Sequence, residues 1–287
     1  MNNLLIEYWL IRMYFKLPNR YQKLLKRLYE WYIFISAPYR KFILDLKFTL
    51  IWSSIRNKKI KNINLFEQKV YSQNGEDGII KIIFYKIGVI NKFCVEFGVE
   101  NGLECNTHYL IEKEGWGYLH MDCGDYTKFY THIKKEFITA ENINSLFEKY
   151  NVPKEFDLLS IDIDYNTYWV WKAIKGYKAR VVVIEYNASF PQTESKVVKY
   201  DPNKMWDGTN YYGASLLALV KLGKLKGYTL VGCDKRGINA FFVRDDFVND
   251  HFMIKDIKEL YKPPSYGIKI NGKYIGHSPS NEPFISV

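Results

Sequence analysis

The chain has 287 residues, 47% of them hydrophobic, and a formal net charge of +10. This length and hydrophobic content predict a substantial core and argue against a disordered chain. Residues 1–63 contain 13 Lys and Arg against three acidic residues, whereas residues 64–287 contain 28 of each sign. We therefore expect three parts: a basic, aromatic-rich helical extension at 1–63, an α/β domain at 64–260 and a tail at 261–287.

The cysteines and the N-terminus indicate the cellular compartment. No two cysteines form a Cys-x-x-Cys pair, which predicts buried free thiols, argues against a zinc site and favours a reducing, cytoplasmic location. The N-terminus lacks a basic segment and a small-residue cleavage site, so we expect no secretory signal. The apolar run Leu4–Phe15 contains Glu7 and Arg12 and is too short to span a membrane.

The extension at 1–63 is expected to form three helices, with Pro38 ending the second. Its Tyr, Trp and Phe residues are mixed with Lys and Arg, a composition suited to the interface of an anionic membrane. Binding at the inner membrane face is therefore one interpretation, and packing on the domain or pairing of two subunits in a homodimer is the other. Nucleic acid is the partner that this composition favours least.

Strand and helix patterns alternate through the domain. The expected strands are Phe93–Val99, Tyr118–Asp122, Phe137–Ala140, Phe156–Asp162, Val181–Tyr186, Tyr228–Cys233 and Ile238–Arg244. Helices between most of them predict a doubly wound, mostly parallel seven-stranded sheet. A short turn with Arg236 and Gly237 predicts that the last two strands form an antiparallel hairpin. The tail, rich in Pro, Gly and Ser, is expected to be a loosely ordered strap.

The first expected strand ends in a turn that contains Gly98 and Gly102. Glycine lets the main chain approach a ligand, and a helix expected from Leu103 would direct free N–H groups at it. Asp122 ends the second strand 24 residues after Gly98, close to the spacing of a carboxylate that binds a ribose diol. Because the turn differs from the Gly-x-Gly-x-x-Gly of nicotinamide enzymes, a methyl donor fits better than NAD.

Polar side chains end the fourth and fifth strands: Asp162, Asp164, Glu185 and Asn187. Adjacent parallel strands would bring these three carboxylates and the amide oxygen to one edge of the sheet. Carboxylates so close raise one another's pKa unless a proton or cation lies between them, and oxygen ligands of this type suit Mg²⁺. Alternatively, Asp162 or Asp164 acts without a metal as a general base, or only orients the acceptor.

These segments carry a resemblance to a known family. Val95–Gly102, Asp157–Asp164 and Val182–Asn187 resemble strand ends of class I S-adenosylmethionine (SAM) methyltransferases, and Ser72–Asp77 before them is similar to the FkbM-type group. That group O-methylates sugars and secondary metabolites. The resemblance implies that Glu96 orders the loop or the methionine ammonium, and that Glu141 and Asn142 lie near adenine. From their place at the ends of adjacent strands, we expect Asp162, Asp164 and Glu185 to carry the catalysis.

We therefore expect a SAM-dependent O-methyltransferase that acts on a hydroxyl of a sugar, glycan or glycoconjugate, with the loop 188–212 as a lid. An NAD-dependent Rossmann-type oxidoreductase or epimerase is one alternative. A non-catalytic, methyltransferase-like interaction protein is another. It is suggested by Tyr165 and Thr167, which stand where the FkbM-type pattern has a glycine and a further acid.

Overall fold

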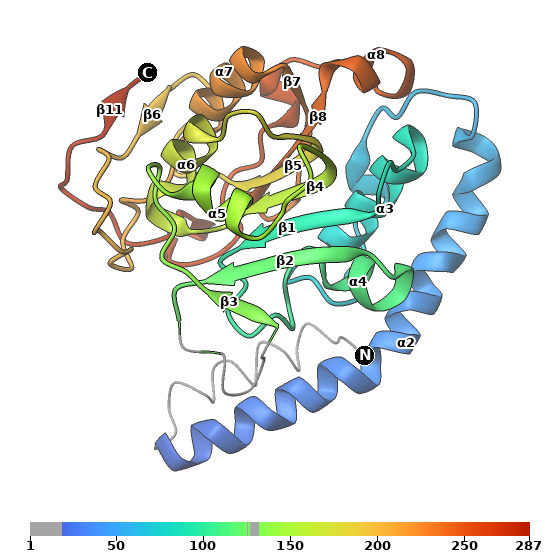
Figure 1. The fold of residues 1–287 in the computed structure, drawn as a ribbon, viewed down its shortest axis with the longest axis horizontal. Coiled ribbons are helices and arrows are strands. Elements are labelled where there is room, and N and C mark those ends of the chain that lie inside the picture. Colours follow the sequence, from blue (N-terminus) through green and yellow to red (C-terminus); the bar gives the residue numbers. More distant parts are fainter. Residues whose placement is uncertain (1–18, 125, 127–131) are drawn as a thin grey trace.

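The computed structural model describes residues 19–124, 126 and 132–287. At its centre lies a seven-stranded sheet with the order β3-β2-β1-β4-β5-β8-β7 (Figure 1). Pairs from β3 to β5 are parallel, and β8 is antiparallel to β5 and β7. The strands are β1 (Phe93–Phe97), β2 (Gly117–Asp122), β3 (Ile133–Lys135), β4 (Glu155–Ile161), β5 (Lys178–Glu185), β7 (Tyr228–Cys233) and β8 (Asn239–Arg244). The expected mostly parallel α/β sheet with a final antiparallel hairpin is confirmed.

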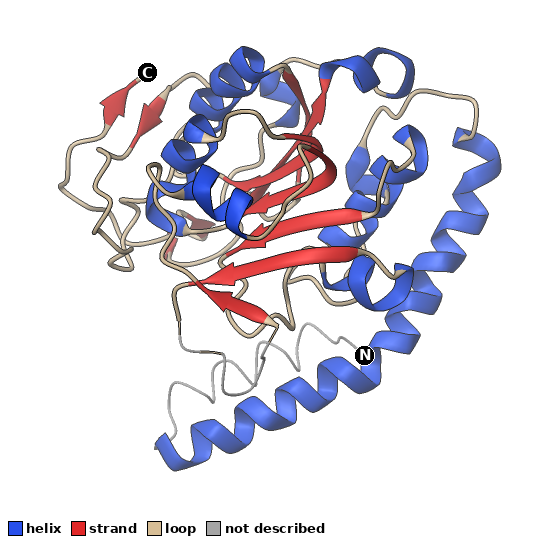
Figure 2. Cartoon of the chain, viewed as in Figure 1, coloured by secondary structure: helices blue, strands red, loops and turns tan. Residues whose placement is uncertain are grey.

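Helices cover both faces of this sheet (Figure 2). Successive strand residues point to opposite faces, so Cys94 and Val95 of β1 belong to two different cores. The core around Cys94 includes α2 (Asn19–Ile55), α3 (Glu76–Ile87) and α4 (His108–Glu114), and the core around Val95 includes α5 (Ile143–Lys149), α6 (Thr167–Ala173) and α7 (Leu216–Lys226). The remaining elements are short: η1 (Ile63–Leu65), β6 (Lys196–Val197), η2 (Asp164–Asn166), η3 (Asp245–Phe247), α8 (Val248–His251), α9 (Ile257–Leu260), β9 (Lys269–Ile270), β10 (Lys273–Tyr274) and β11 (Ile285–Ser286).

The expectation that Pro38 ends a helix is wrong, because α2 continues through it as one helix of 37 residues. A proline inside a helix costs about 3 kcal/mol. Packing outweighs that cost, since Ile33 and Ala37 before Pro38 and Leu44 and Phe48 after it are all buried. Figure 1 shows α2 bending around the domain, as a helix does at an internal proline. The expected helix at 4–15 lies outside the described residues.

The expectation for the third strand is also wrong in position, because β3 covers 133–135 rather than 137–140. The last bond of its ladder joins the Glu136 N–H to the Asp122 carbonyl at 2.9 Å. Beyond it the chain turns into α5, and the side-chain oxygen of Asn142 accepts from the Thr139 N–H at 2.8 Å.

Of the helices that the structure describes, none is both long and apolar enough to cross a membrane.

Residues 261–287 are part of the folded domain rather than the loosely ordered strap that we expected. Strand β11 pairs antiparallel with β6. The Asn210 N–H donates to the Ser278 carbonyl at 2.8 Å, and the rings of Tyr211 and Phe284 lie 4.8 Å apart. The tail therefore packs against the loop that follows β5, and both segments border a cavity at the carboxyl ends of the strands.

Candidate active site

A cavity of about 680 Å³ opens at the carboxyl ends of β1, β2, β4 and β5. This is the edge where open α/β sheets bind their ligands. Of the residues singled out from the sequence, six line the cavity: Glu96, Gly98, Asp122, Asp162, Asp164 and Glu185. Gly102, Glu141, Asn142 and Asn187 are not among its described lining residues.

Gly98 lets the end of β1 approach the end of β4. Its φ is +72°, and a Cβ at this position would lie 1.5 Å from the carbonyl oxygen of Asp162. No side chain fits there. Gly102 also has a positive φ, of +75°, and its N–H donates to the Val99 carbonyl at 2.7 Å. It shapes the turn that leads away from the cavity.

Glu96 holds this turn in place. Its carboxylate accepts four hydrogen bonds, from the N–H of Asn106 (2.9 Å), the N–H and hydroxyl of Thr107 (2.9 and 2.6 Å) and the hydroxyl of Ser160 (2.9 Å). The helix that we expected from Leu103 begins at His108. Glu96 binds the N–H groups of Asn106 and Thr107, the two residues that precede this helix. Of the two roles implied for Glu96, the geometry therefore supports the ordering of the loop.

Asp122 lies at the end of β2, where its carboxylate faces the turn after β1. One oxygen accepts from the Glu100 N–H at 2.8 Å and the other from the Gly124 N–H at 2.7 Å. The residue is 8% exposed and lines the cavity. Because each oxygen accepts only one of these bonds, each keeps a lone pair for a hydroxyl of a bound ligand.

The residues expected near adenine lie elsewhere. The carboxylate of Glu141 is exposed and accepts a hydrogen bond from the Tyr200 hydroxyl, while the Asn142 amide is bonded to the Thr139 N–H and the Phe137 carbonyl. Because β3 ends earlier than expected, Phe137 and Ile138 line the cavity instead. The sequence signal for them was their apolar character, which we had assigned to a strand.

Asp162, Asp164 and Glu185 form a compact cluster in which one oxygen of each lies within 4.8 Å of the others. Its origin is the register of two neighbouring parallel strands. Ile161 of β4 pairs with Ile184 of β5, so Asp162 and Glu185 follow at the same level. Asp164 has a φ of +53°, a strained conformation of the kind that is concentrated at functional sites.

The carboxylates of this cluster have few hydrogen-bond donors or cations around them. Oε2 of Glu185 is buried without a hydrogen bond, and no ion pair in the part of the chain that the structure describes includes a member of the cluster. Burial and the neighbouring Asp164 raise the pKa of Asp162, and burial and Asp162 raise that of Glu185. Burial and the charge of Glu100 raise the pKa of Asp164 to about 6. A proton or a divalent cation relieves this repulsion, and the all-oxygen donor set fits Mg²⁺.

Asn187, expected as a fourth ligand, is used by the fold. Its amide nitrogen donates to the carbonyls of Asn210 (2.7 Å) and Tyr212 (2.9 Å), and its amide oxygen accepts from the Ser189 N–H at 3.1 Å. These bonds tie the beginning and the end of the loop 188–212 together. Of the four residues expected as metal ligands, the three carboxylates therefore remain as candidates.

Two segments cover the cavity, the loop 188–212 and the tail. Trp206 from the loop and His277 from the tail line it, with ring centroids 4.6 Å apart in an edge-on arrangement. Tyr266 also lines it, and its hydroxyl lies 2.8 Å from that of Tyr212. The contribution of the loop was expected. That of Tyr266 and His277 was missed, because a sequence rich in Pro and Gly does not show where the tail folds.

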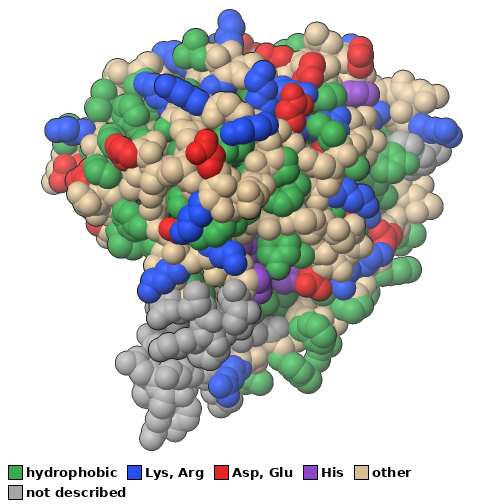
Figure 3. All heavy atoms as spheres, viewed as in Figure 1, with side chains coloured by type: hydrophobic (Ala, Val, Ile, Leu, Met, Phe, Trp, Pro, Cys, Tyr) green, Lys and Arg blue, Asp and Glu red, His purple; other side chains and the backbone are tan. Residues whose placement is uncertain are grey.

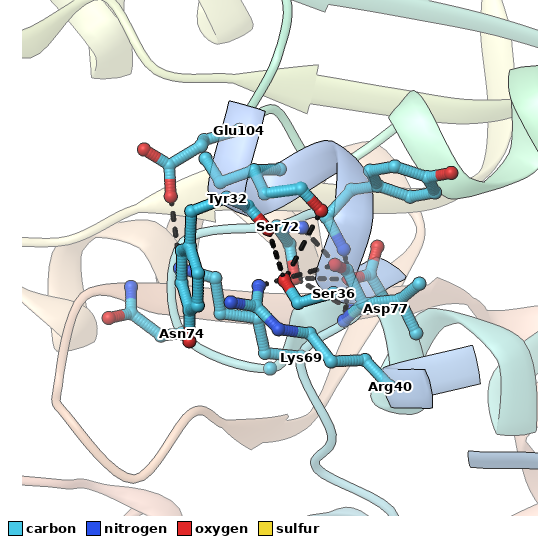
Figure 4. Close-up of polar contacts among 12 residues, drawn as sticks. Tyr32, Ser36, Arg40, Lys69, Ser72, Asn74, Asp77 and Glu104 are labelled. Carbon is cyan, nitrogen blue, oxygen red and sulfur yellow. Dashed lines mark hydrogen bonds and ion pairs between the residues drawn. The ribbon is translucent and has the colours of Figure 1, made fainter. Parts of the chain in front are cut away.

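Residues 72–77 form a structural loop beside the cavity. Oδ2 of Asp77 accepts from the N–H groups of Val70, Tyr71 and Ser72 at 2.7–2.8 Å, and burial raises its pKa to about 6. Figure 4 shows this network next to α2, from which Arg40 donates to the Val70 carbonyl at 3.4 Å. The loop thereby places Gln73 and Glu76 in the cavity wall.

The cavity is strongly acidic. Its described lining contains nine carboxylate residues and one lysine, Lys204. Desolvation lowers the pKa of His277, which favours the neutral imidazole in the cavity cover. Such a lining favours cationic ligands and disfavours anionic ones.

Comparison of the sequence with protein-family models and with curated proteins gave no match.

Proposed function

We propose that this chain is a SAM-dependent O-methyltransferase that acts on a hydroxyl of a sugar or glycoconjugate. The observation that carries the proposal is one cavity with Asp122 on one side and the donor-poor cluster of Asp162, Asp164 and Glu185 on the other. The first can hold a cofactor ribose, and the second can act on an acceptor hydroxyl.

Charge favours SAM over NAD. SAM carries a positive sulfonium and a positive ammonium group, whereas the pyrophosphate of NAD is negative. Those of the nine acidic residues in the described lining that are ionised attract the former and repel the latter. The antiparallel β7–β8 hairpin at the end of the parallel sheet is also the arrangement that the resemblance to SAM methyltransferases implies.

The roles of the residues follow from their positions. Asp122 would accept hydrogen bonds from the ribose hydroxyls, while Gly98 lets the end of β1 lie close to Asp162 at the end of β4, so that both strand ends line one cavity. Bound SAM would supply an electrophilic methyl group to the acceptor oxygen, with S-adenosylhomocysteine as the leaving group. Asp164, whose pKa is raised to about 6, is suited to take the hydroxyl proton near neutral pH.

The carboxylate cluster also fits Mg²⁺, with Asp162, Asp164 and Glu185 as ligands. A bound Mg²⁺ would supply Lewis acidity that makes an acceptor hydroxyl easier to deprotonate. Trp206, Tyr266 and His277 would position that acceptor, because aromatic faces mixed with hydrogen-bonding groups suit a sugar ring. Holding the acceptor oxygen in line with the methyl group is the main contribution that a protein makes to methyl transfer.

Calorimetric titration with SAM and, separately, with NAD tests the proposal. We expect saturable binding of SAM and none of NAD. Binding of NAD alone would indicate an oxidoreductase or epimerase, and binding of neither would indicate the non-catalytic alternative. If SAM binds, transfer of its labelled methyl group to a panel of sugars and glycoconjugates, with and without EDTA, tests the acceptor class and the metal.

A further inference from the structure

Helix α2 has two contrasting faces. Its inner face packs on the domain through buried residues such as Ile33, Ala37 and Leu44. Its outer face carries four aromatic side chains, Trp31, Phe34, Tyr39 and Phe42, which are 61–74% exposed and which we call the aromatic face. Figure 3 shows hydrophobic side chains at the lower right surface, where Figure 1 places α2. Contiguous exposed apolar groups of this size mark an interaction surface.

The shape of α2 argues against a second helix as the occupant of this face. A coiled coil with Leu28, Ile35 and Phe42 at the first core position of each heptad would place Pro38 and Asp45 at the second. Asp45 is instead bonded to Lys41 and Lys81 of the same chain. The bend at Pro38 also makes the aromatic face convex, because the buried face is the concave one that follows the domain.

Charge identifies the occupant. Residues 46–63 contain five Lys and Arg and no acidic residue, and the whole net charge of +10 comes from residues 1–63. Arg56, Lys58, Lys59 and Lys61 are exposed just beyond the end of α2. They follow Phe42 by 14 residues or more, about 20 Å along the helix, and the exposed Leu46 and Leu50 continue the apolar surface between them. A helix with exposed rings that leads into a cluster of cations matches the headgroup region of an anionic bilayer, where rings insert and Lys or Arg meets phosphate.

We infer that the aromatic face of α2 docks the protein on an anionic phospholipid membrane. Ile33, on the opposite face of the same helix, lines the cavity. Docking would therefore place the cavity about one helix diameter, roughly 10 Å, from the lipid surface. The inference does not depend on the proposed methyl transfer, since it rests on the outer surface of α2 and on the basic segment that follows it.

Co-sedimentation of the full chain with phospholipid vesicles tests this inference. We expect binding to vesicles of phosphatidylcholine mixed with phosphatidylglycerol and much weaker binding to phosphatidylcholine alone. The triple variant Trp31→Gln, Phe34→Gln, Phe42→Gln should bind the mixed vesicles at least about tenfold more weakly, because the inserted rings are lost. The matched control Leu225→Gln, Ile270→Gln, Ile285→Gln removes three exposed apolar side chains outside α2 and outside the basic segment after it, and should bind as the wild type does.

A charge variant separates the two contributions. Lys58→Gln, Lys59→Gln, Lys61→Gln should weaken binding at about 0.1 M salt but have little effect at about 0.5 M, where the charges are screened. Thermal unfolding of each variant checks that the domain is intact. Absence of binding by the full chain, or equal binding by the aromatic variant, would overturn the inference.

Light scattering tests the alternative that a second copy of this chain occupies the aromatic face. A full chain that ignores vesicles, and that falls from dimer to monomer in the aromatic variant, would show that this face joins two copies. Titration with SAM is a separate measurement, so a failure of the proposed function is distinguishable from a failure of membrane docking.

Discussion

Glu96 and Glu185 are glutamates at the carboxyl ends of β1 and β5, the two strands that flank β4. Glu96 accepts four hydrogen bonds from the turn before α4 and from Ser160. Glu185 has a buried oxygen with no donor and lies against two more carboxylates. Identical side chains at one sheet edge thus meet opposite surroundings. Glu96 is used to hold the fold, whereas Glu185 is available to a proton, a cation or a substrate.

The largest expected effect comes from making the same change at both positions. Glu96→Gln should lower the free energy of unfolding by about 2–3 kcal/mol, because an amide group cannot accept all the bonds that the carboxylate accepts. Glu185→Gln should leave stability unchanged or raise it by about 1 kcal/mol, because it removes like-charge repulsion. Urea unfolding of both variants without divalent cations measures this difference. Equal losses would remove the distinction between the two glutamates.

Asp122 has fewer hydrogen-bond donors than Glu96 and more than Glu185, because each of its oxygens accepts from one backbone N–H. Asp122→Ala should weaken SAM binding by about 1–3 kcal/mol, the cost of losing hydrogen bonds to a charged group. Glu141→Ala is the matched control, since Glu141 is exposed and outside the described lining of the cavity. Titration calorimetry of both variants checks the assignment. An unchanged affinity of the Asp122 variant would exclude it from the site.

A smaller effect concerns pH. Burial raises the folded-state pKa of Asp164 from 3.8 to about 6, so its stabilising contribution is present below about pH 4 and is lost as the pH rises through 6. Asp164→Asn keeps a residue that tolerates the positive φ and removes this titration. Asp77 also titrates near 6, but it is present in both proteins. The difference in unfolding free energy between wild type and variant should therefore change between pH 4 and 7. A constant difference would mean that Asp164 ionises normally.

Much of the fold could be predicted because its signals are local. Alternating strands and helices indicated the sheet, and the turn before β8 indicated the hairpin. Pro38 misled the prediction of α2, because the burial of Ile33 and Leu44 on either side of it is a tertiary effect. The third strand was misplaced because an edge strand of three residues carries little pattern.

In the candidate site, too, the features with a local sequence signal could be predicted and those set by tertiary contacts could not. Asp162 and Glu185 could be paired from the sequence, since the ends of adjacent parallel strands meet. Glu96 could not be separated from Glu185, because only the positions of Thr107 and Ser160 show that its carboxylate is occupied. Tyr266 and His277 reach the cavity by long-range folding of the tail, which no local pattern indicates.

The donor-poor carboxylates are central to the proposed function, because they are expected to hold a ligand rather than the fold. Calorimetric titration of Mg²⁺ into the wild type and into Glu185→Gln tests this role directly. We predict one Mg²⁺ site in the wild type and its loss in the variant, while both proteins remain folded. Equal binding by the two proteins, or none by the wild type, would contradict a cation site at Asp162, Asp164 and Glu185 and would leave these residues a metal-free role.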